Sequence, residues 1–323
     1  MRRRDFISLI GSAAAWPLAA RAQQGSVLRV GFLGLAPAAG YTGRIAALRA
    51  GLADFGFVEG KNFTFDLRWA ERPQQLDEFA AELVKAGSAV IMTSGNAATL
   101  SAKSATSTIP IVFSAADDPV RLGVVASFNQ PGGNMTGVSL ISGALGAKRI
   151  DLIRELAPKE TLIGVLRNPN NPAEAASRDE LAVAHKVGQE LLVLDVASAD
   201  GIEAAFATLV EKRANALLVN ADAIFTAHRD RIVSLAARHK IWALYPWREY
   251  AESGGLMSYG PSLAESYHQM GVYAGRILRG VKPSDLPVMQ PTAIELVLNL
   301  KTAQMLGVEF PPKLLALADA VIE

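Results

Sequence analysis

The chain has 323 residues, of which 50% are hydrophobic and 20% charged, so it is long enough for two globular domains. Its formal charge is +1, and removing the first 22 residues, which contain four arginines and one aspartate, leaves −2. A body so close to neutral gives no reason to expect nucleic acid as a partner, and the absence of cysteine excludes disulfides, thiolate metal sites and cysteine nucleophiles.

Residues 1–22 are predicted to be an export signal peptide. The segment has a basic start, a weakly apolar stretch at Phe6–Ala20 and a small-x-small cleavage site at Ala20-Arg21-Ala22. Arg3-Arg4-Asp5-Phe6-Ile7 resembles the twin-arginine signal. The alternative is a retained membrane anchor, but the stretch is shorter than the ~20 residues that a span needs. We therefore expect a periplasmic protein, cleaved near Ala22.

From Val27 onward, strands alternate with helices, which is typical of a parallel α/β sheet. The first set has predicted strands at Val27–Leu35, Asn62–Trp69, Ala89–Met92, Ile109–Phe113 and Met135–Leu140, and predicted helices at Tyr41–Phe55, Leu76–Ala86, Ala97–Thr106 and Val120–Phe128.

The same alternation then starts again. The second set has predicted helices at Lys148–Leu156, Ala173–Gly188, Gly201–Arg213 and Ile224–His239, and predicted strands at Leu162–Leu166, Glu190–Val196, Ala216–Val219, Ile241–Leu244 and Gly255–Tyr259. Two successive sets of this size, each of about 110 residues, favour two similar Rossmann-like lobes over one large sheet.

The remaining segment is too short for a third domain. It has a predicted helix at Leu263–Arg279, a strand at Ile294–Asn299, and helices at Leu300–Leu306 and Leu314–Ile322, which complete the sheets already built. This predicts lobes at 26–139 plus 260–290 and at 140–259 plus 291–323. Three crossovers, near Leu140, Tyr259 and Pro291, would then act as hinges, as in two-lobed binding proteins.

Polar residues follow two neighbouring strands of the first set at the point where each strand ends. Ala89–Met92 leads into Thr93-Ser94-Gly95-Asn96, and Ile109–Phe113 leads into Ser114-Ala115-Ala116-Asp117-Asp118-Pro119. Ligands of such sheets bind at the carboxyl ends of the strands, where helix N-termini present free N–H groups. The alternative is that these residues only cap helices, because Ser, Thr, Asn and Asp are preferred there.

Longer stretches of the chain resemble a known family. They are RVGFLGL, GLADFGFVEGKNFTFDLRWA, TSTIPIVFSAADDPVRLGVVASFNQPGGNMTGVS, GLMSYGPSLAE and DLPVMQPTAIELVLNLKTAQMLG. The chain resembles the periplasmic substrate-binding proteins of ABC transporters, of the type I fold, and within them the family that includes tryptophan- and phenylalanine-binding members. The resemblance implies a monomer without cofactor or catalytic activity, which holds an amino acid or a related small molecule between its lobes and delivers it to a membrane permease.

The resemblance also implies a set of ligand-binding residues, all close to strand ends. The first lobe would contribute Thr93, Ser94, Asn96 and Asp118, and the second lobe Asn168, Asn170, Asp222 and Tyr245. The last member of the set is Tyr259, which lies where the chain crosses again between the lobes.

Chemistry suggests roles for these residues. Thr93, Ser94 and the N–H groups around Asn96 suit a carboxylate, whereas Asp222 or Asp118 suits an ammonium group. An aromatic side chain at 245 or 247 would stack on a ring or form a wall of the cleft. Alternatives remain open: Asp118 as an N-cap before Pro119, Asn168-Pro169 as a turn, and Trp247 as lobe packing.

Several kinds of catalytic site are absent from the sequence. It has no G-x-G-x-x-G, P-loop or G-x-S-x-G motif, and its four histidines do not have metal-ligand spacing. Two other functions stay open, a ligand-sensing module for a membrane receptor and, less favoured, a secreted enzyme. A sugar-responsive repressor would need a DNA-binding headpiece where this chain has its export signal.

Overall fold

The computed structural model describes residues 27–35, 38–140, 145–157, 161–171, 184, 186 and 188–323. The predicted signal peptide at residues 1–22 lies outside these residues. So does the predicted helix Ala173–Gly188, apart from residues 184, 186 and 188.

The first half of the chain forms a five-stranded sheet in which every strand pair is parallel. Its order is β2-β1-β3-β4-β5. The strands are β1 (Leu28–Leu35), β2 (Phe63–Ala70), β3 (Val90–Ser94), β4 (Ile111–Ala115) and β5 (Met135–Ser139), with the short helix η1 (Ala38–Tyr41) and the helices α3 (Thr42–Ala53), α4 (Gln75–Lys85) and α5 (Asn96–Ala105) between them. All residues of β3, β4 and β5 are buried, as expected for parallel strands covered on both faces.

The second half repeats this topology in a seven-stranded sheet. Five parallel strands have the order β7-β6-β8-β9-β10, which matches the order of the first sheet, and β11 and β12 extend it beyond β10. Only the β10–β11 pair is antiparallel. The strands are β6 (Ile163–Arg167), β7 (Leu191–Asp195), β8 (Ala216–Val219), β9 (Trp242–Tyr245), β10 (Met257–Pro261), β11 (Ile294–Asn299) and β12 (Ala320–Ile322).

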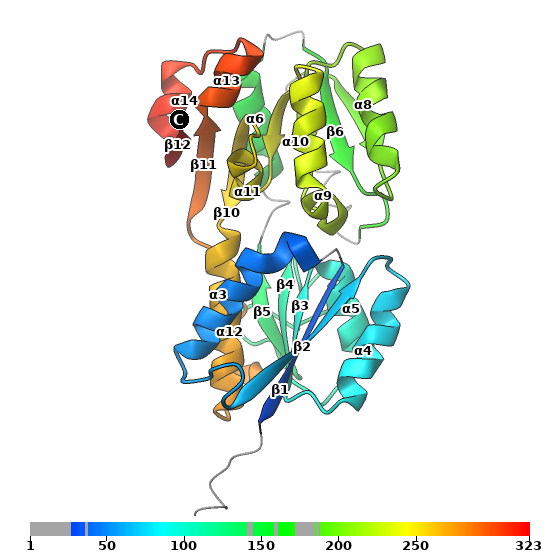
Figure 1. Ribbon diagram of the computed structural model, residues 1–323, viewed down its shortest axis with the longest axis vertical. Helices are drawn as coiled ribbons and strands as arrows, with labels where there is room; N and C mark the ends of the chain where they lie inside the picture. Colours follow the sequence, from blue (N-terminus) through cyan, green and yellow to red (C-terminus); the bar gives the residue numbers. More distant parts are fainter. Residues whose placement is uncertain are drawn as a thin grey trace, which may run out of the picture.

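Helices pack around this second sheet, and the two sheets with their helices form two lobes, one above the other (Figure 1). We call them the five-stranded lobe and the seven-stranded lobe. The helices of the seven-stranded lobe are α6 (Gly146–Leu156), α8 (Gly201–Glu211), α9 (Ala223–Ala227), α10 (Arg229–Arg238), α11 (Arg248–Glu252), α13 (Leu300–Leu306) and α14 (Pro312–Leu317). The predicted fold class, two α/β lobes built on mainly parallel sheets, is confirmed.

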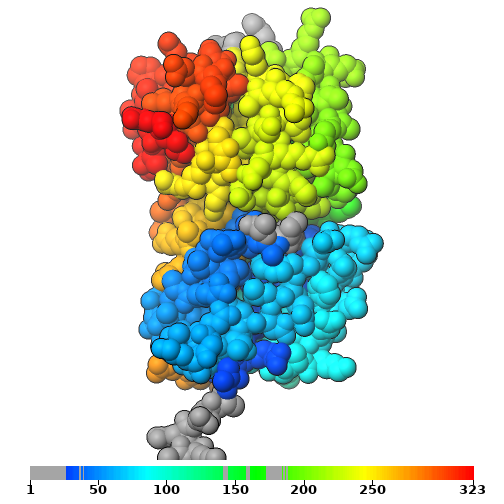
Figure 2. Space-filling model, in the orientation of Figure 1, coloured from blue at the N-terminus to red at the C-terminus, as the bar shows by residue number. Residues whose placement is uncertain are grey.

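The chain passes between the lobes three times. It leaves the five-stranded lobe after β5, returns after β10 through the long helix α12 (Leu263–Leu278), and leaves again after Met289 to form β11. Before this last crossing, past the short helix η3 (Pro283–Asp285), Met289 pairs with β5: its N–H donates to Gly137 (2.9 Å) and its carbonyl accepts from Ser139 (2.8 Å). The returning α12, in orange, therefore lies among the blue segments of the lower lobe (Figure 2).

Three predicted helices differ from the structure. Residues 120–128 form turns, because the Asp118 side chain accepts from Val120 N–H and Gly123 has a φ of +65°. The predicted helix Ile224–His239 is divided into α9 and α10 at His228, whose φ and ψ are −105° and 24°.

The third difference is at the end of the chain. The predicted helix Leu314–Ile322 stops at Leu317, and the next residues become β12. Pairing with β11 competes with helix formation here: Asp319 N–H donates to the Leu296 carbonyl, and the Asp319 carboxylate accepts from Leu296 N–H, at 2.9 and 2.7 Å.

Helices α3 and α12 touch backbone to backbone, which anchors the returning helix to the five-stranded lobe. A Cβ atom added at Gly51 would lie 2.1 Å from the His268 carbonyl oxygen, and one added at Gly271 would lie 2.3 Å from the Leu48 carbonyl oxygen. Only glycine allows the two helices to approach so closely at these positions.

We predict that Gly51→Ala lowers the free energy of unfolding by about 1–3 kcal/mol, because the added methyl group must push α12 away from α3. Gly43→Ala is the matched control on the same helix. Gly43 has no atom within 4 Å of an added Cβ, so alanine there should be neutral or stabilising by up to about 1 kcal/mol. Denaturant unfolding of both variants measures the difference, and equal effects would contradict the role of the α3–α12 contact.

Candidate functional site

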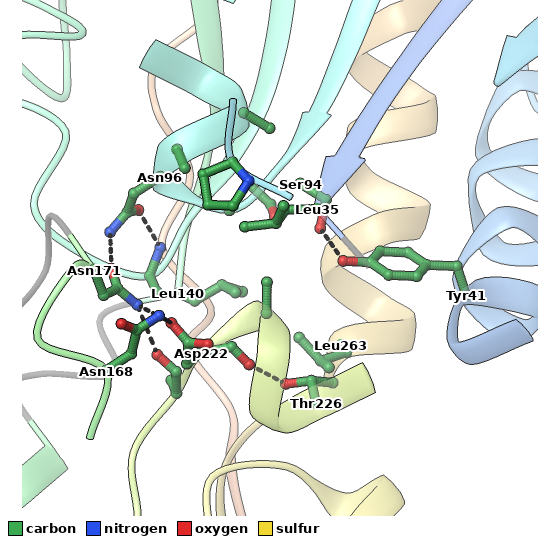
Figure 3. A pocket seen from close by; sticks show the side chains of 18 of the residues that line it. Leu35, Tyr41, Ser94, Asn96, Leu140, Asn168, Asn171, Asp222, Thr226 and Leu263 are labelled. Carbon is green, nitrogen blue, oxygen red and sulfur yellow. Dashed lines mark hydrogen bonds between the residues drawn. The ribbon is translucent and has the colours of Figure 1, made fainter. Parts of the chain in front are cut away.

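A cavity of about 310 Å³ lies between the two lobes, at the carboxyl ends of the strands (Figure 3). The loops after β3, β4 and β5 form one side, and the loops after β6, β7, β8 and β9 form the other. Polar groups from two separate sheets therefore converge on a single space. The lining residues are Leu35, Tyr41, Arg44, Pro73, Gln74, Ser94, Gly95, Asn96, Ala97, Ala98, Ser114, Ala116, Leu140, Asn168, Asn170, Asn171, Ala197, Ala221, Asp222, Ala223, Thr226, Trp247, Leu263 and Tyr267.

Five of the nine residues expected from the sequence lie on this lining: Ser94, Asn96, Asn168, Asn170 and Asp222. Ser94 ends β3 and Asn96 begins α5. Asn168 and Asn170 lie in the loop after β6, and Asp222 lies between β8 and α9.

The other four expected residues do not line the cavity. The Thr93 hydroxyl bonds that of Thr99 in the core at 2.8 Å, and the exposed Asp118 accepts backbone N–H groups of its own turn. The Tyr245 ring is buried and stacks on another tyrosine ring, with centroids 4.8 Å apart. Tyr259 packs against the core of the seven-stranded lobe.

Asp222 is the centre of a hydrogen-bonded group in the seven-stranded lobe, which we call the Asp222 group. It caps α9, with Oδ1 accepting the Ile224 N–H at 2.8 Å, while Oδ2 accepts the side-chain amides of Asn171 at 2.8 Å and Asn168 at 3.1 Å. Burial raises the pKa of the Asp222 carboxyl above its usual range, against the opposing effect of these donors. The carboxyl group is thus held in place, but its donors do not fully offset the cost of burying its charge.

Asn96 connects the Asp222 group to the five-stranded lobe. Its side-chain oxygen accepts the Ala116 N–H at 3.0 Å, and its amide nitrogen donates to the Asn171 oxygen across the cavity at 3.4 Å. Asn96 reaches this position because Gly95, with a φ of +87°, makes the sharp turn from β3 into α5. Figure 3 shows the contact between the two lobes.

Three side-chain hydroxyls form a second polar cluster, in the five-stranded lobe, which we call the hydroxyl cluster. Ser94 Oγ lies 3.1 Å from the Tyr41 hydroxyl and 2.5 Å from the hydroxyl of Tyr267, which comes from the returning helix α12. Burial, together with the nearby Tyr267, raises the pKa of Tyr41 to about 12. Tyr41 therefore remains a neutral hydrogen-bonding group at physiological pH.

Arg44 lies beside this cluster on α3 and is 8% exposed. Its guanidinium carbon is 4.6 Å from the centroid of the Tyr41 ring and 5.6 Å from that of Tyr267, which is cation–π geometry. Apolar side chains such as Leu35 and Leu140 separate the cluster from the Asp222 group (Figure 3). The cavity thus has two polar regions of different chemistry with an apolar region between them.

Sequence reasoning missed several lining residues: Tyr41, Arg44, Asn171, Thr226 and Tyr267. Asn171 could have been found, since it belongs to the same polar loop as Asn168. Tyr267 gave no such signal, because it lies in the middle of a helix that enters the site from a distant part of the sequence. Trp247, which the sequence left open, lines the cavity and is 4% exposed.

In the part of the chain that the structure describes, no three or more His, Cys, Asp or Glu side chains are grouped so that they could hold a metal ion.

Comparison with known proteins gives one family and several relatives. Residues 40–322 match the family model described as ABC transporter substrate binding protein. A curated relative, the tyrosine-binding protein of Clostridioides difficile, is 26% identical over 260 residues, which are 80% of this chain and 74% of the relative.

Solved structures show the same similarity. A conserved domain protein from Vibrio cholerae is 28% identical with a TM-score of 0.83, and an ABC domain from Streptococcus pneumoniae in complex with L-Trp is 25% identical with a TM-score of 0.82. Each comparison covers 92% of this chain and 100% of the other.

Proposed function

Since this chain belongs to the ABC transporter substrate binding protein family, we propose that it is the solute-binding component of an ABC importer and captures an amino acid between its lobes. One observation carries this proposal: the carboxyl ends of two parallel sheets present polar side chains to the same cavity. The cavity volume of about 310 Å³ fits a single small molecule. Proteins of this family bind solutes and work with membrane permeases, so we propose no catalytic step.

The ligand that we propose is an aromatic amino acid or a close relative. One similar protein is named a tyrosine-binding protein, and the solved structure of another is a complex with L-Trp. The Asp222 carboxylate suits an ammonium group, because burial has removed most of its water while its three donors hold it in place. Trp247 and the tyrosines of the lining suit a ring.

We further propose that the two lobes close on the ligand. The predicted lobes, 26–139 plus 260–290 and 140–259 plus 291–323, meet at the three crossings described above, and these segments would bend. The contact between Asn96 and Asn171 would then form on closure and enclose the ligand. We expect the protein to act as a monomer that is recognised by its permease.

We propose that the protein reaches the periplasm through the twin-arginine signal at its N-terminus. Binding proteins of ABC importers work outside the cytoplasm. None of the helices in the described ranges has the length and hydrophobicity that a membrane span requires.

We predict that Asp222→Ala and Asp222→Asn both weaken ligand binding by roughly 3–5 kcal/mol, because the ligand ammonium would be buried without its counter-charge. A thermal-shift screen of amino acids, aromatic acids, purines and sugars first identifies the ligand, and calorimetry then measures its affinity for each variant. Asp222→Ala should also cost about 1 kcal/mol of stability through the lost cap, whereas Asn preserves the capping group.

Asp118→Ala is the matched control, since Asp118 caps a turn in the same way but does not line the cavity. It should cost stability without changing affinity. If both Asp222 variants bind like the parent, Asp222 serves only as a cap and the ammonium site is elsewhere.

We predict that the exported protein begins near Gln23, as found by mass spectrometry of periplasmic material. Replacing both Arg3 and Arg4 with lysine should leave the precursor uncleaved, because the signal depends on the arginine pair, while Arg2→Lys should be processed normally. Recovery of intact Met1 from a membrane fraction of the parent would contradict cleavage.

A further inference from the structure

Arg44 is a buried cation on the cavity wall, without an ion-pair partner among the residues that the structure describes. It lines the cavity at 8% exposure, and among the described residues no carboxylate oxygen lies within 4.0 Å of its nitrogens. By contrast, Arg248 and Arg167 are more exposed and each has an acidic partner.

The groups around Arg44 hold its side chain without neutralising it. Tyr41 and Tyr267 offer their rings to the guanidinium. A guanidinium has five N–H donors in one plane, so these contacts leave donors for a further acceptor. A buried charge without a paired counter-charge is costly, and a site that keeps one is prepared for an anion.

Glu249, on α11 of the opposite lobe, is an acidic residue that acts electrostatically on Arg44. It lies beyond ion-pair distance and does not line the cavity, and its buried Oε2 has no hydrogen-bond partner among the described residues. Glu249 is therefore the alternative counter-ion for Arg44, and any test must separate it from a ligand.

We propose that Arg44 binds an acidic group of the ligand, which for an amino acid is its carboxylate, next to the hydroxyl of Ser94. This inference rests on the proposed function and adds a selection rule to it. The Asp222 group and the pair Ser94–Tyr41 lie on different sides of the cavity, in different lobes (Figure 3). A ligand must carry both a cationic and an anionic group to satisfy the two lobes, so amines, amides and neutral sugars are rejected.

Calorimetry with three small-molecule probes tests this rule on the mature protein, which begins near Gln23. L-tryptophan carries both charges, tryptophanamide lacks the carboxylate, and indole-3-propionate lacks the ammonium group. We expect only L-tryptophan to bind tightly, and Arg44→Gln to weaken its binding at least about 100-fold. Arg248→Gln, which removes an exposed arginine outside the cavity, should leave affinity unchanged. Equal binding of tryptophanamide and L-tryptophan would overturn the proposal.

Melting temperatures of the ligand-free variants test the same residue without a ligand. If Arg44 awaits a ligand anion, Arg44→Gln should melt at or above the parent temperature, and Arg44→Gln/Glu249→Gln should bind as weakly as Arg44→Gln alone. If Arg44 instead neutralises Glu249, Arg44→Gln should melt well below the parent, and the double variant should recover both stability and binding. That recovery would overturn the proposal. Should none of the three probes bind the parent, the proposed tryptophan-like ligand is wrong, while these melting temperatures still decide the role of Arg44.

Discussion

Partly buried charges on two facing sheet edges are the feature on which the site depends. Parallel strands bring all their carboxyl ends to one edge, and the chain builds two such edges with the same strand order and faces them toward one another. Asp222 comes from one edge, and Arg44 and Ser94 lie at the other. Each charged group has lost much of its water, and neither has an ion-pair partner among the described residues. The ligand that we propose, with complementary charges, would supply what both lobes lack.

The three crossings between the lobes are the segments that we propose to bend when a ligand binds. The returning helix α12 is fixed to the five-stranded lobe by its close contact with α3 and brings Tyr267 to Ser94. These contacts hold the cavity wall of that lobe together without a ligand. Among the described residues, Asn96 and Asn171 form a direct side-chain contact between the lobes at the cavity, at 3.4 Å. A contact of this length is weak, as the opening and closing that we propose for the lobes would require.

The sequence predicted much of the fold because the strands are short apolar runs bounded by polar loops. β8 and α13 have the predicted boundaries, and the polar residues after β3, β6 and β8 lie on the cavity. Local patterns could not show which side of a strand end faces the cavity. Tyr245 and Trp247 are two residues apart, yet Tyr245 packs in the core and Trp247 lines the site. Tyr41, Arg44 and Tyr267 were missed because only the packing of α12 on α3 brings them together.

The central claim is that one small molecule is held by both lobes at once. A crystal structure of the protein with the tightest binder from the ligand screen tests it most directly. The account predicts ligand density inside the cavity, with a cationic group at the Asp222 carboxylate and an anionic group at Arg44 and Ser94. A ligand found outside the cavity, or one that contacts only one lobe in a closed structure, would contradict it.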